Sequence, residues 1–192
     1  MGKLDALGGR VRQTIRAFHG TPHPEDVLAR GLDPRRIGSS NGTAEGHGYY
    51  FSEDRALSRW YGEPLAVEID VPRRSIADWY SPVRSQGDLL DRFAQAVKSA
   101  PDNKWKQDAF AEMMRRDGEA HLVYQSLLRA HNVGDGAGRL GRYEAGRRAS
   151  EALREHGVLG GRWVDEMTTE PGAANYLLFP GVEDSIRILR RP

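Results

Sequence analysis

The sequence predicts an α+β domain, because strand-like segments occupy both ends of the chain and a long helical stretch lies between them. Leu65–Val71 alternates strictly between apolar and polar residues, which is typical of a strand with one buried face. From 87 to 156 the apolar residues recur at helical spacing instead. A chain of 192 residues suits one domain with a sizeable core and leaves little room for two. We therefore expect a single domain over residues 1–192, with a helical insertion at 87–156 and a flexible or peripheral N-terminus at 1–12.

Shorter patterns supply the remaining elements. A helix is expected over Glu25–Arg30, where Gly31 stops it, and another is expected to open at Ser52–Asp54 and run through Tyr61. The segment 33–48 is rich in Gly, Ser and Asn without periodicity, which predicts a mobile loop. Further strands are expected at Thr14–Phe18, Tyr49–Phe51, Val158–Val164, Asn175–Phe179 and Ile186–Leu189.

Composition excludes several classes of protein. The 28 basic and 27 acidic residues nearly cancel, which argues against a dedicated nucleic-acid or membrane-surface binder. The chain has no Cys, so it has no disulfide framework and no thiolate metal site, and its six His residues show no metal-ligand spacing. No apolar stretch approaches the length of a membrane span. We expect a cytoplasmic protein that binds neither a metal nor a membrane.

The segment Phe18-His19-Gly20-Thr21 is the first candidate site. It is expected to form a turn that ends a strand and offers an imidazole, a bare backbone edge and a hydroxyl in one place. A single His after a strand is most simply a structural residue. Gly20 changes this interpretation, because a residue without a side chain lets the N–H and C=O of the backbone pair with the carboxamide of a ligand.

The second candidate segment is Gly46-His47-Gly48-Tyr49-Tyr50-Phe51, followed by Ser58 and Tyr61. Residues three apart on a helix share a face, so Ser58 and Tyr61 point together. Tyr50 and Tyr61 could sandwich a planar ring whose amide bonds to Ser58. The set predicts a slot for the nicotinamide of NAD+. The alternative is a structural domain whose aromatic residues are core, and His47 is equally compatible with a place near the slot and with a solvent-facing one.

These residues resemble the ADP-ribosyltransferase fold of the poly-ADP-ribose polymerase and diphtheria-toxin branch. That branch has a His-Gly-Ser/Thr turn, a Gly-x-Gly-x-Tyr-Phe strand, and a Ser and then a Tyr on the next helix, which match the two segments above. The chain is most similar to the phage and mobile-element group of this branch. That likeness lies in Asp78-Trp79, in Ala149–Leu153 and in Asn175–Phe179, so the resemblance spans about Phe18 to Leu189. It implies two small packed β-sheets around an NAD+ cleft.

The resemblance also implies roles for single residues. His19 would orient the ribose, Gly20 would pair with the nicotinamide amide, Tyr50 and Tyr61 would stack on the ring, and Ser58 would bind the carboxamide. The residues expected to bind NAD+ are His19, Gly20, Thr21, Tyr50, Phe51, Ser58 and Tyr61. The residues expected to act in catalysis are His19, Tyr50 and Asn175. The implied reaction cleaves the N-glycosidic bond of NAD+, releases nicotinamide and passes ADP-ribose to a macromolecular acceptor.

Asn175 departs from the family pattern, which has a glutamate at this position. An amide still accepts a hydrogen bond but brings no charge, and charge-assisted bonds are roughly twice as strong as neutral ones. We therefore expect mono-ADP-ribosylation rather than chain formation. Within the phage-type group Asn is usual at this position, which argues against a simple loss of activity. Glu170 could substitute, but its simpler interpretation is a solvated loop acid. The alternatives are an NAD+ glycohydrolase and an inactive NAD+/ADP-ribose-binding module. The acceptor is expected to be a protein rather than a nucleic acid, and the chain a phage or mobile-element effector in the host cytoplasm.

Overall fold

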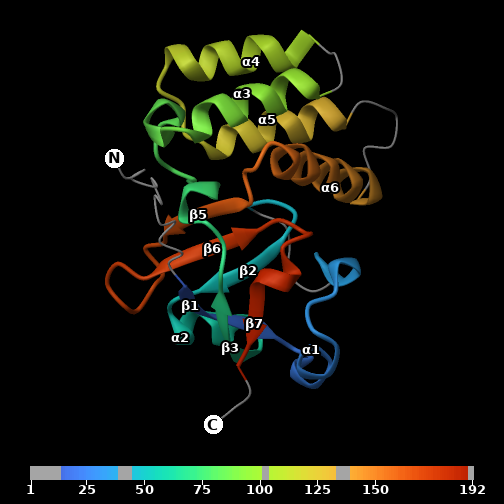
Figure 1. Ribbon diagram of the computed structural model, residues 1–192, viewed down its shortest axis with the longest axis vertical. Helices are drawn as coiled ribbons and strands as arrows, with labels where there is room; N and C mark the ends of the chain where they lie inside the picture. The colour runs from blue at the N-terminus through green and yellow to red at the C-terminus, as the bar shows by residue number, and fades with distance from the viewer. Residues whose placement is uncertain (1–13, 39–44, 101–103, 133–138, 190–192) are drawn as a thin grey trace, which may run out of the picture.

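The computed structural model describes residues 14–38, 45–100, 104–132 and 139–189, and within them it has six α-helices and one seven-stranded mixed sheet (Figure 1). The strands are β1 Ile15–Thr21, β2 Tyr49–Ser52, β3 Glu63–Ile69, β4 Ile76–Asp78, β5 Gly160–Val164, β6 Ala174–Leu178 and β7 Ile186–Ile188. Their order across the sheet is β4-β5-β6-β2-β1-β3-β7. The pair β4 and β5 is parallel and the other pairs are antiparallel. The prediction of an α+β fold is confirmed.

Four helices form a layer over one side of the sheet and follow one another in the chain between β4 and β5 (Figure 1). The helices of the structure are α1 Pro24–Arg30, α2 Arg55–Ser58, α3 Leu89–Ser99, α4 Lys104–Arg115, α5 His121–His131 and α6 Arg139–Glu155. The helical stretch predicted at 87–156 therefore holds α3 to α6. The expected N-terminal segment 1–12 lies outside the described residues.

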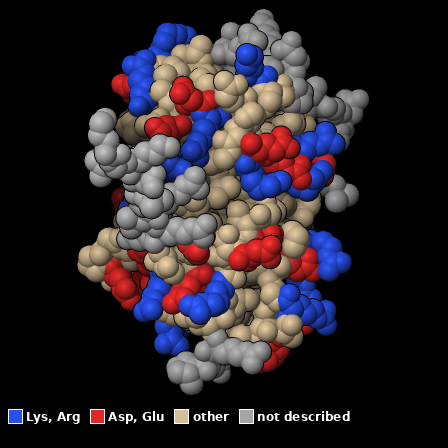
Figure 2. Space-filling model, viewed as in Figure 1, with Lys and Arg blue, Asp and Glu red and all other residues tan. Residues whose placement is uncertain are grey.

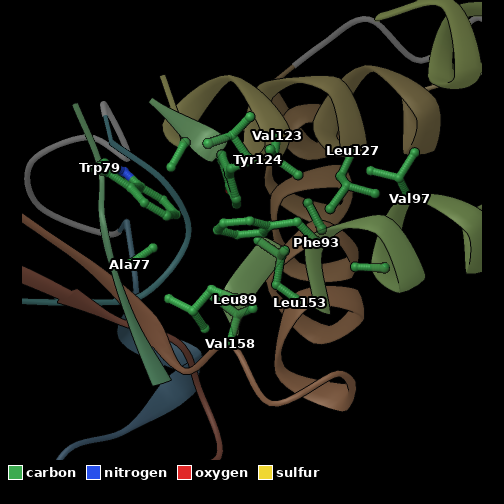
Figure 3. Close-up of a cluster of buried hydrophobic side chains, with 14 of the residues drawn as sticks. Ala77, Trp79, Leu89, Phe93, Val97, Val123, Tyr124, Leu127, Leu153 and Val158 are labelled. Atoms are coloured by element: carbon green, nitrogen blue, oxygen red, sulfur yellow. The ribbon is translucent and has the colours of Figure 1, made fainter. Parts of the chain in front are cut away.

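The helical layer and the sheet share one apolar cluster. Phe93 of α3, Leu127 of α5 and Leu153 of α6 are fully buried and point toward one another (Figure 3). Trp79 after β4 and Leu177 of β6 belong to the same cluster. Because these side chains come from the helices and from the sheet, the helical layer buries its apolar faces against the sheet as well as within itself.

The opposite face of the sheet carries a second apolar cluster. Ala17 of β1, Phe51 of β2, Val67 of β3 and Leu178 of β6 belong to it. Leu177 and Leu178 are neighbours in the chain and contribute to different clusters, because successive side chains of a strand point to opposite faces. The sheet is therefore buried on both faces in its centre.

The prediction of two separate β-sheets is wrong, because a single pairing joins the two halves. β4, β5, β6 and β2 make one half, and β1, β3 and β7 make the other. Between β1 and β2 the register has one pair, Phe18 with Ser52, whereas β1 pairs with β3 from Ile15 to Thr21. Beyond Phe18 and Ser52 the two strands diverge. The seven strands of the described residues therefore form one sheet, but its two halves are joined by only one residue pair.

The predicted His-Gly-Thr turn is also wrong, because these residues complete β1. His19 pairs with Leu65, Gly20 with Pro64 and Thr21 with Glu63. β3 thus pairs with residues of β1 that lie beyond Phe18, where the first strand was expected to end. His19, Gly20 and Thr21 are therefore paired with β3 on one side, and on the other side they face the gap where β1 and β2 diverge.

The charged surface is mixed. Figure 2 shows basic and acidic side chains interspersed on the face in view. On α6, Arg147 contacts Glu144 and Glu151, and Arg148 contacts Glu144 at 2.9 Å. Within the described residues no helix is both long enough and apolar enough to cross a membrane.

Candidate functional site

A cavity of about 310 Å³ opens where β1 and β2 diverge. Strands β1, β2 and β6 and helix α2 supply its inner wall, and α1 with the segment after it supplies the outer part. Every residue expected from the sequence to bind NAD+ or to act in catalysis lines it: His19, Gly20, Thr21, Tyr50, Phe51, Ser58, Tyr61 and Asn175. The structure thus brings together residues from the first and last thirds of the chain.

His19 is fixed by the strand that it faces. Its Nδ1 lies 2.9 Å from the carbonyl oxygen of Tyr50, and its ring lies 5.5 Å from the ring of Phe51. A carbonyl only accepts, so Nδ1 carries the proton and Nε2 is left as an acceptor. Burial lowers the pKa of His19, although the bond to the Tyr50 carbonyl opposes this, so the ring is neutral at pH 7.

Gly20 brings helix α2 against β1. A Cβ at this position would lie 2.0 Å from the carbonyl oxygen of Ser58 and 3.0 Å from the Cβ of Tyr61. The sequence predicted that the missing side chain of Gly20 lets a ligand approach the backbone. On this side of Gly20, it is helix α2 that approaches the backbone. Because the glycine admits it, Ser58 and Tyr61 reach the wall of the cavity.

Ser58 and Tyr61 differ in exposure. Ser58 is 3% exposed, and its hydroxyl donates to the carbonyl oxygens of Phe18 and Asp54, each at 3.2 Å. Its oxygen lone pairs are the part of this side chain that remains for a ligand. Tyr61 is 49% exposed and stands at the open side of the cavity. Thr21 is buried, and its Oγ1 accepts from the N–H of His23 at 3.1 Å, as a turn cap does.

Tyr50 is held at both ends of its side chain. Its hydroxyl donates to the carbonyl oxygen of Gly46 at 2.9 Å and accepts from the N–H of Glu45 at 3.1 Å. Its ring meets Trp163 edge to face at 6.4 Å. Burial raises the pKa of Tyr50, so this residue stays neutral and serves as a rigid wall.

The segment Glu45–Gly48 is packed against the helical layer, contrary to the prediction of a mobile loop through residue 48. Trp79 Nε1 donates to the Glu45 carbonyl at 3.2 Å, and the Tyr80 hydroxyl donates to Glu45 Oε2 at 2.7 Å. The adjoining stretch 39–44 of the expected loop lies outside the described residues.

His47 neither lines the cavity nor faces solvent, so both expectations for it are wrong. It is 2% exposed, and its N–H donates to the Tyr124 hydroxyl at 2.8 Å. Its carbonyl accepts from Ser150 at 2.7 Å, and its ring meets Tyr143 at 4.7 Å. His47 therefore joins β2 to helices α5 and α6.

Asn175 lies in the inner wall. It is 5% exposed, and in the sheet register it stands between Ser52 of β2 and Trp163 of β5. Glu170 is exposed and does not line the cavity, which agrees with its interpretation as a solvated loop acid. The loop after β5 is instead tied to α2, because both the N–H and the hydroxyl of Thr169 donate to Asp54 Oδ2.

The sequence did not indicate the charged residues of the cavity. Asp26 pairs with Arg36 at 2.8 Å, Asp33 pairs with Arg35 at 2.8 Å, and Asp165 follows β5. No motif marked them, since their place depends on how α1 and the loop after β5 fold back. Among the described residues, no group of three or more His, Asp or Glu is placed to hold a metal ion.

Comparison of the chain with protein-family models, with curated proteins and with solved structures finds no match.

Proposed function

We propose that the chain is an NAD+-dependent mono-ADP-ribosyltransferase, which transfers ADP-ribose to a macromolecular acceptor and releases nicotinamide. One observation carries the proposal. Every residue that the motifs assigned to the NAD+ site lines a single cavity, although the motifs are far apart in the chain. The volume of about 310 Å³ lies at the lower end of the range of small-molecule sites, and the open side leaves room for a ligand that projects outward.

The polar groups of the cavity suit nicotinamide riboside. A neutral His19 with Nε2 as an acceptor fits a ribose hydroxyl, which is a donor. Ser58 directs its own hydrogen at backbone carbonyls, so its oxygen fits an N–H of the carboxamide. Tyr50 and Tyr61 both border the cavity, one rigid and one exposed, and a planar ring between them would gain stacking of about 0.5–1.5 kcal/mol per aromatic contact.

The proposed chemistry is cleavage at C1′ of the ribose. The bond from C1′ to the nicotinamide nitrogen breaks, and its electron pair neutralises the pyridinium charge. A nucleophile of the acceptor bonds to C1′ and loses its proton. Positive charge develops on the sugar in the transition state, so hydrogen-bond acceptors and negative charge near the ribose accelerate the step. Asn175 gives only a neutral acceptor here, which favours a single transfer over chain formation.

The test is release of nicotinamide from NAD+, with the labelled product identified by mass spectrometry after labelled NAD+ is added to a cell lysate. His19→Ala and Tyr50→Ala should abolish nicotinamide release. His156→Ala is the matched control, because this residue bonds to Ser99 at 3.1 Å outside the cavity. Undiminished NAD+ consumption in both cavity variants contradicts the assignment of the site.

The lack of a charge at Asn175 favours two alternatives, which the nicotinamide-release assay and calorimetry separate. Free ADP-ribose without a labelled macromolecule indicates an NAD+ glycohydrolase. Calorimetric binding of NAD+ without release of nicotinamide indicates a binding module. A chain that does not bind NAD+ is a structural domain whose aromatic residues are core. We propose a protein acceptor and a cytoplasmic location, which in a phage-encoded effector is the host cytoplasm.

A further inference from the structure

The acidic residues of the cavity differ in how far their carboxylates are already engaged. Those that line it are Asp26, Asp33, Glu45 and Asp165. Asp26 pairs with Arg36, and Asp33 holds Arg35 through both of its oxygens. Glu45 accepts from the Tyr80 hydroxyl, outside the inner wall. Among the ion pairs of the described residues, none involves Glu45 or Asp165. Of these two acids, only Asp165 comes from the strand region next to Asn175.

Asp165 directly follows β5, the strand that pairs with the strand of Asn175. Trp163 of β5 is directly opposite Asn175 of β6, and Val164 is opposite Ala174. Trp163 shares a face with Asn175 because the two residues are directly paired. Asp165 is the first residue after β5, two positions beyond Trp163. Diagonal neighbours on one face of an antiparallel pair are about 7–8 Å apart. Trp163, Asp165 and Asn175 all line the cavity.

The loop after β5 fixes the carboxylate. Asp165 Oδ1 accepts from the N–H of Met167 at 2.9 Å, and the Asp165 carbonyl accepts from the Thr168 hydroxyl at 2.7 Å. Thr169 then ties the loop to Asp54, the residue that caps α2. A side chain held through one oxygen keeps the other oxygen oriented without a further loss of entropy, which is what an electrostatic catalyst needs.

We propose that Asp165 is a further catalytic residue, whose carboxylate supplies beside the ribose the negative charge that Asn175 lacks. This inference rests on the proposed transferase. As the bond from C1′ to the nicotinamide nitrogen breaks and its electron pair leaves with nicotinamide, positive charge grows on the sugar. Asp165 Oδ2 stabilises that charge, and Asn175 remains a neutral hydrogen-bond partner. The negative charge is thus supplied by the residue that follows the neighbouring strand.

The test compares Asp165→Asn with wild type in nicotinamide release and in calorimetric binding of NAD+. The Asn variant keeps Oδ1 and removes the charge, so kcat should fall by about 100-fold or more, while the Kd for NAD+ changes by less than about threefold. Glu166→Gln is the matched control, since this neighbouring acid is exposed and lies outside the cavity. Its kcat should equal that of wild type.

A rescue variant separates charge from structure. Adding Asn175→Glu to Asp165→Asn should restore at least about tenfold in kcat, because the charge returns on the adjacent strand. The inference is overturned if Asp165→Asn keeps the wild-type kcat, if it loses NAD+ binding together with activity, or if the rescue fails. If the wild-type chain releases no nicotinamide, the proposed function is overturned and this inference with it. If the wild type and Asp165→Asn are both active, this inference alone is overturned.

Discussion

At Gly20 the backbone of β1 lies so close to the helix after β2 that no side chain fits between them. The nearest atom is a backbone carbonyl oxygen, that of Ser58, which cannot rotate out of the way. The glycine therefore sets the distance between the wall that holds His19 and the wall that holds Ser58 and Tyr61. Gly20 therefore shapes the site through packing, whether or not it also contacts a ligand.

Gly20→Ala should destabilise the fold and weaken NAD+ binding together. The added Cβ must push α2 away from β1, and overpacking of this kind costs about 1–3 kcal/mol of the free energy of unfolding. Urea unfolding and calorimetry measure the two effects. Gly87→Ala is the control, because its Cβ would meet nothing within 4 Å, although its φ of 58° strains the backbone of any residue with a side chain. If both variants bind NAD+ equally well, the spacing role of Gly20 is wrong.

The residues of the candidate site were predictable where a motif carried them. His19, Gly20, Tyr50, Ser58 and Tyr61 lie within two short segments, so their spacing alone indicated a shared site. Asp165 was not predictable in this way. Its place depends on the register of β5 with β6 and on the turn at Met167, which are long-range and loop features without a signature in the sequence.

Helix α2 begins at a capping residue, Asp54, that also holds the loop after β5. Asp54 Oδ1 accepts from the N–H groups of Ala56 at 2.7 Å and Leu57 at 3.2 Å, and Oδ2 holds Thr169 of the loop after β5. Burial works to raise the pKa of Asp54, but these hydrogen bonds outweigh it and lower the pKa to about 2. One carboxylate therefore positions both the helix with Ser58 and the loop with Asp165.

Asp54→Asn should remove stability that depends on pH. The folded-state pKa of about 2 lies below the usual 3.8, so the charged carboxylate stabilises the fold fully above about pH 4 and loses this effect as the pH falls toward 2. The variant leaves a donor of Thr169 without an acceptor, and its free energy of unfolding should fall by about 1–3 kcal/mol at pH 7. Urea unfolding of both proteins at several pH values measures the difference, which should shrink toward pH 2. Glu170→Gln, on the same loop and exposed, should show no such difference. A constant gap at all pH values contradicts the assignment to Asp54.

The strands with clear alternation were predictable and their pairing was not. The alternating segment 65–71 indicated β3 in nearly the right place. β4 was not predicted, because Ile76-Ala77-Asp78 does not alternate between apolar and polar residues, whereas Ile186-Arg187-Ile188 of the equally short β7 does. β1 continues past His19 because its residues pair with β3. This pairing is a long-range contact, which the local sequence around His19 does not indicate. The buried place of His47 likewise results from contacts with α5 and α6 that are distant in the chain.

For the whole molecule, the helical layer and the sheet are coupled by one shared cluster. Trp79, Trp163 and Phe179 of the sheet side belong to the same cluster as Phe93 and Leu127 of the helices. We therefore expect one cooperative unfolding transition, in which tryptophan fluorescence and far-ultraviolet circular dichroism coincide. Phe93 is fully buried, so Phe93→Ala should lower the free energy of unfolding by about 3–5 kcal/mol. Both signals should report the same loss. Separate transitions for the two signals would mean that the helices form a unit of their own.

The lone pairing of Phe18 with Ser52 gives the sheet two edges in its interior. Most sheets carry their open edges at the outside, where another chain can attach. Here the edges of β1 and β2 face each other across the cavity. A bound ring with a ribose would act as a clasp between the two halves.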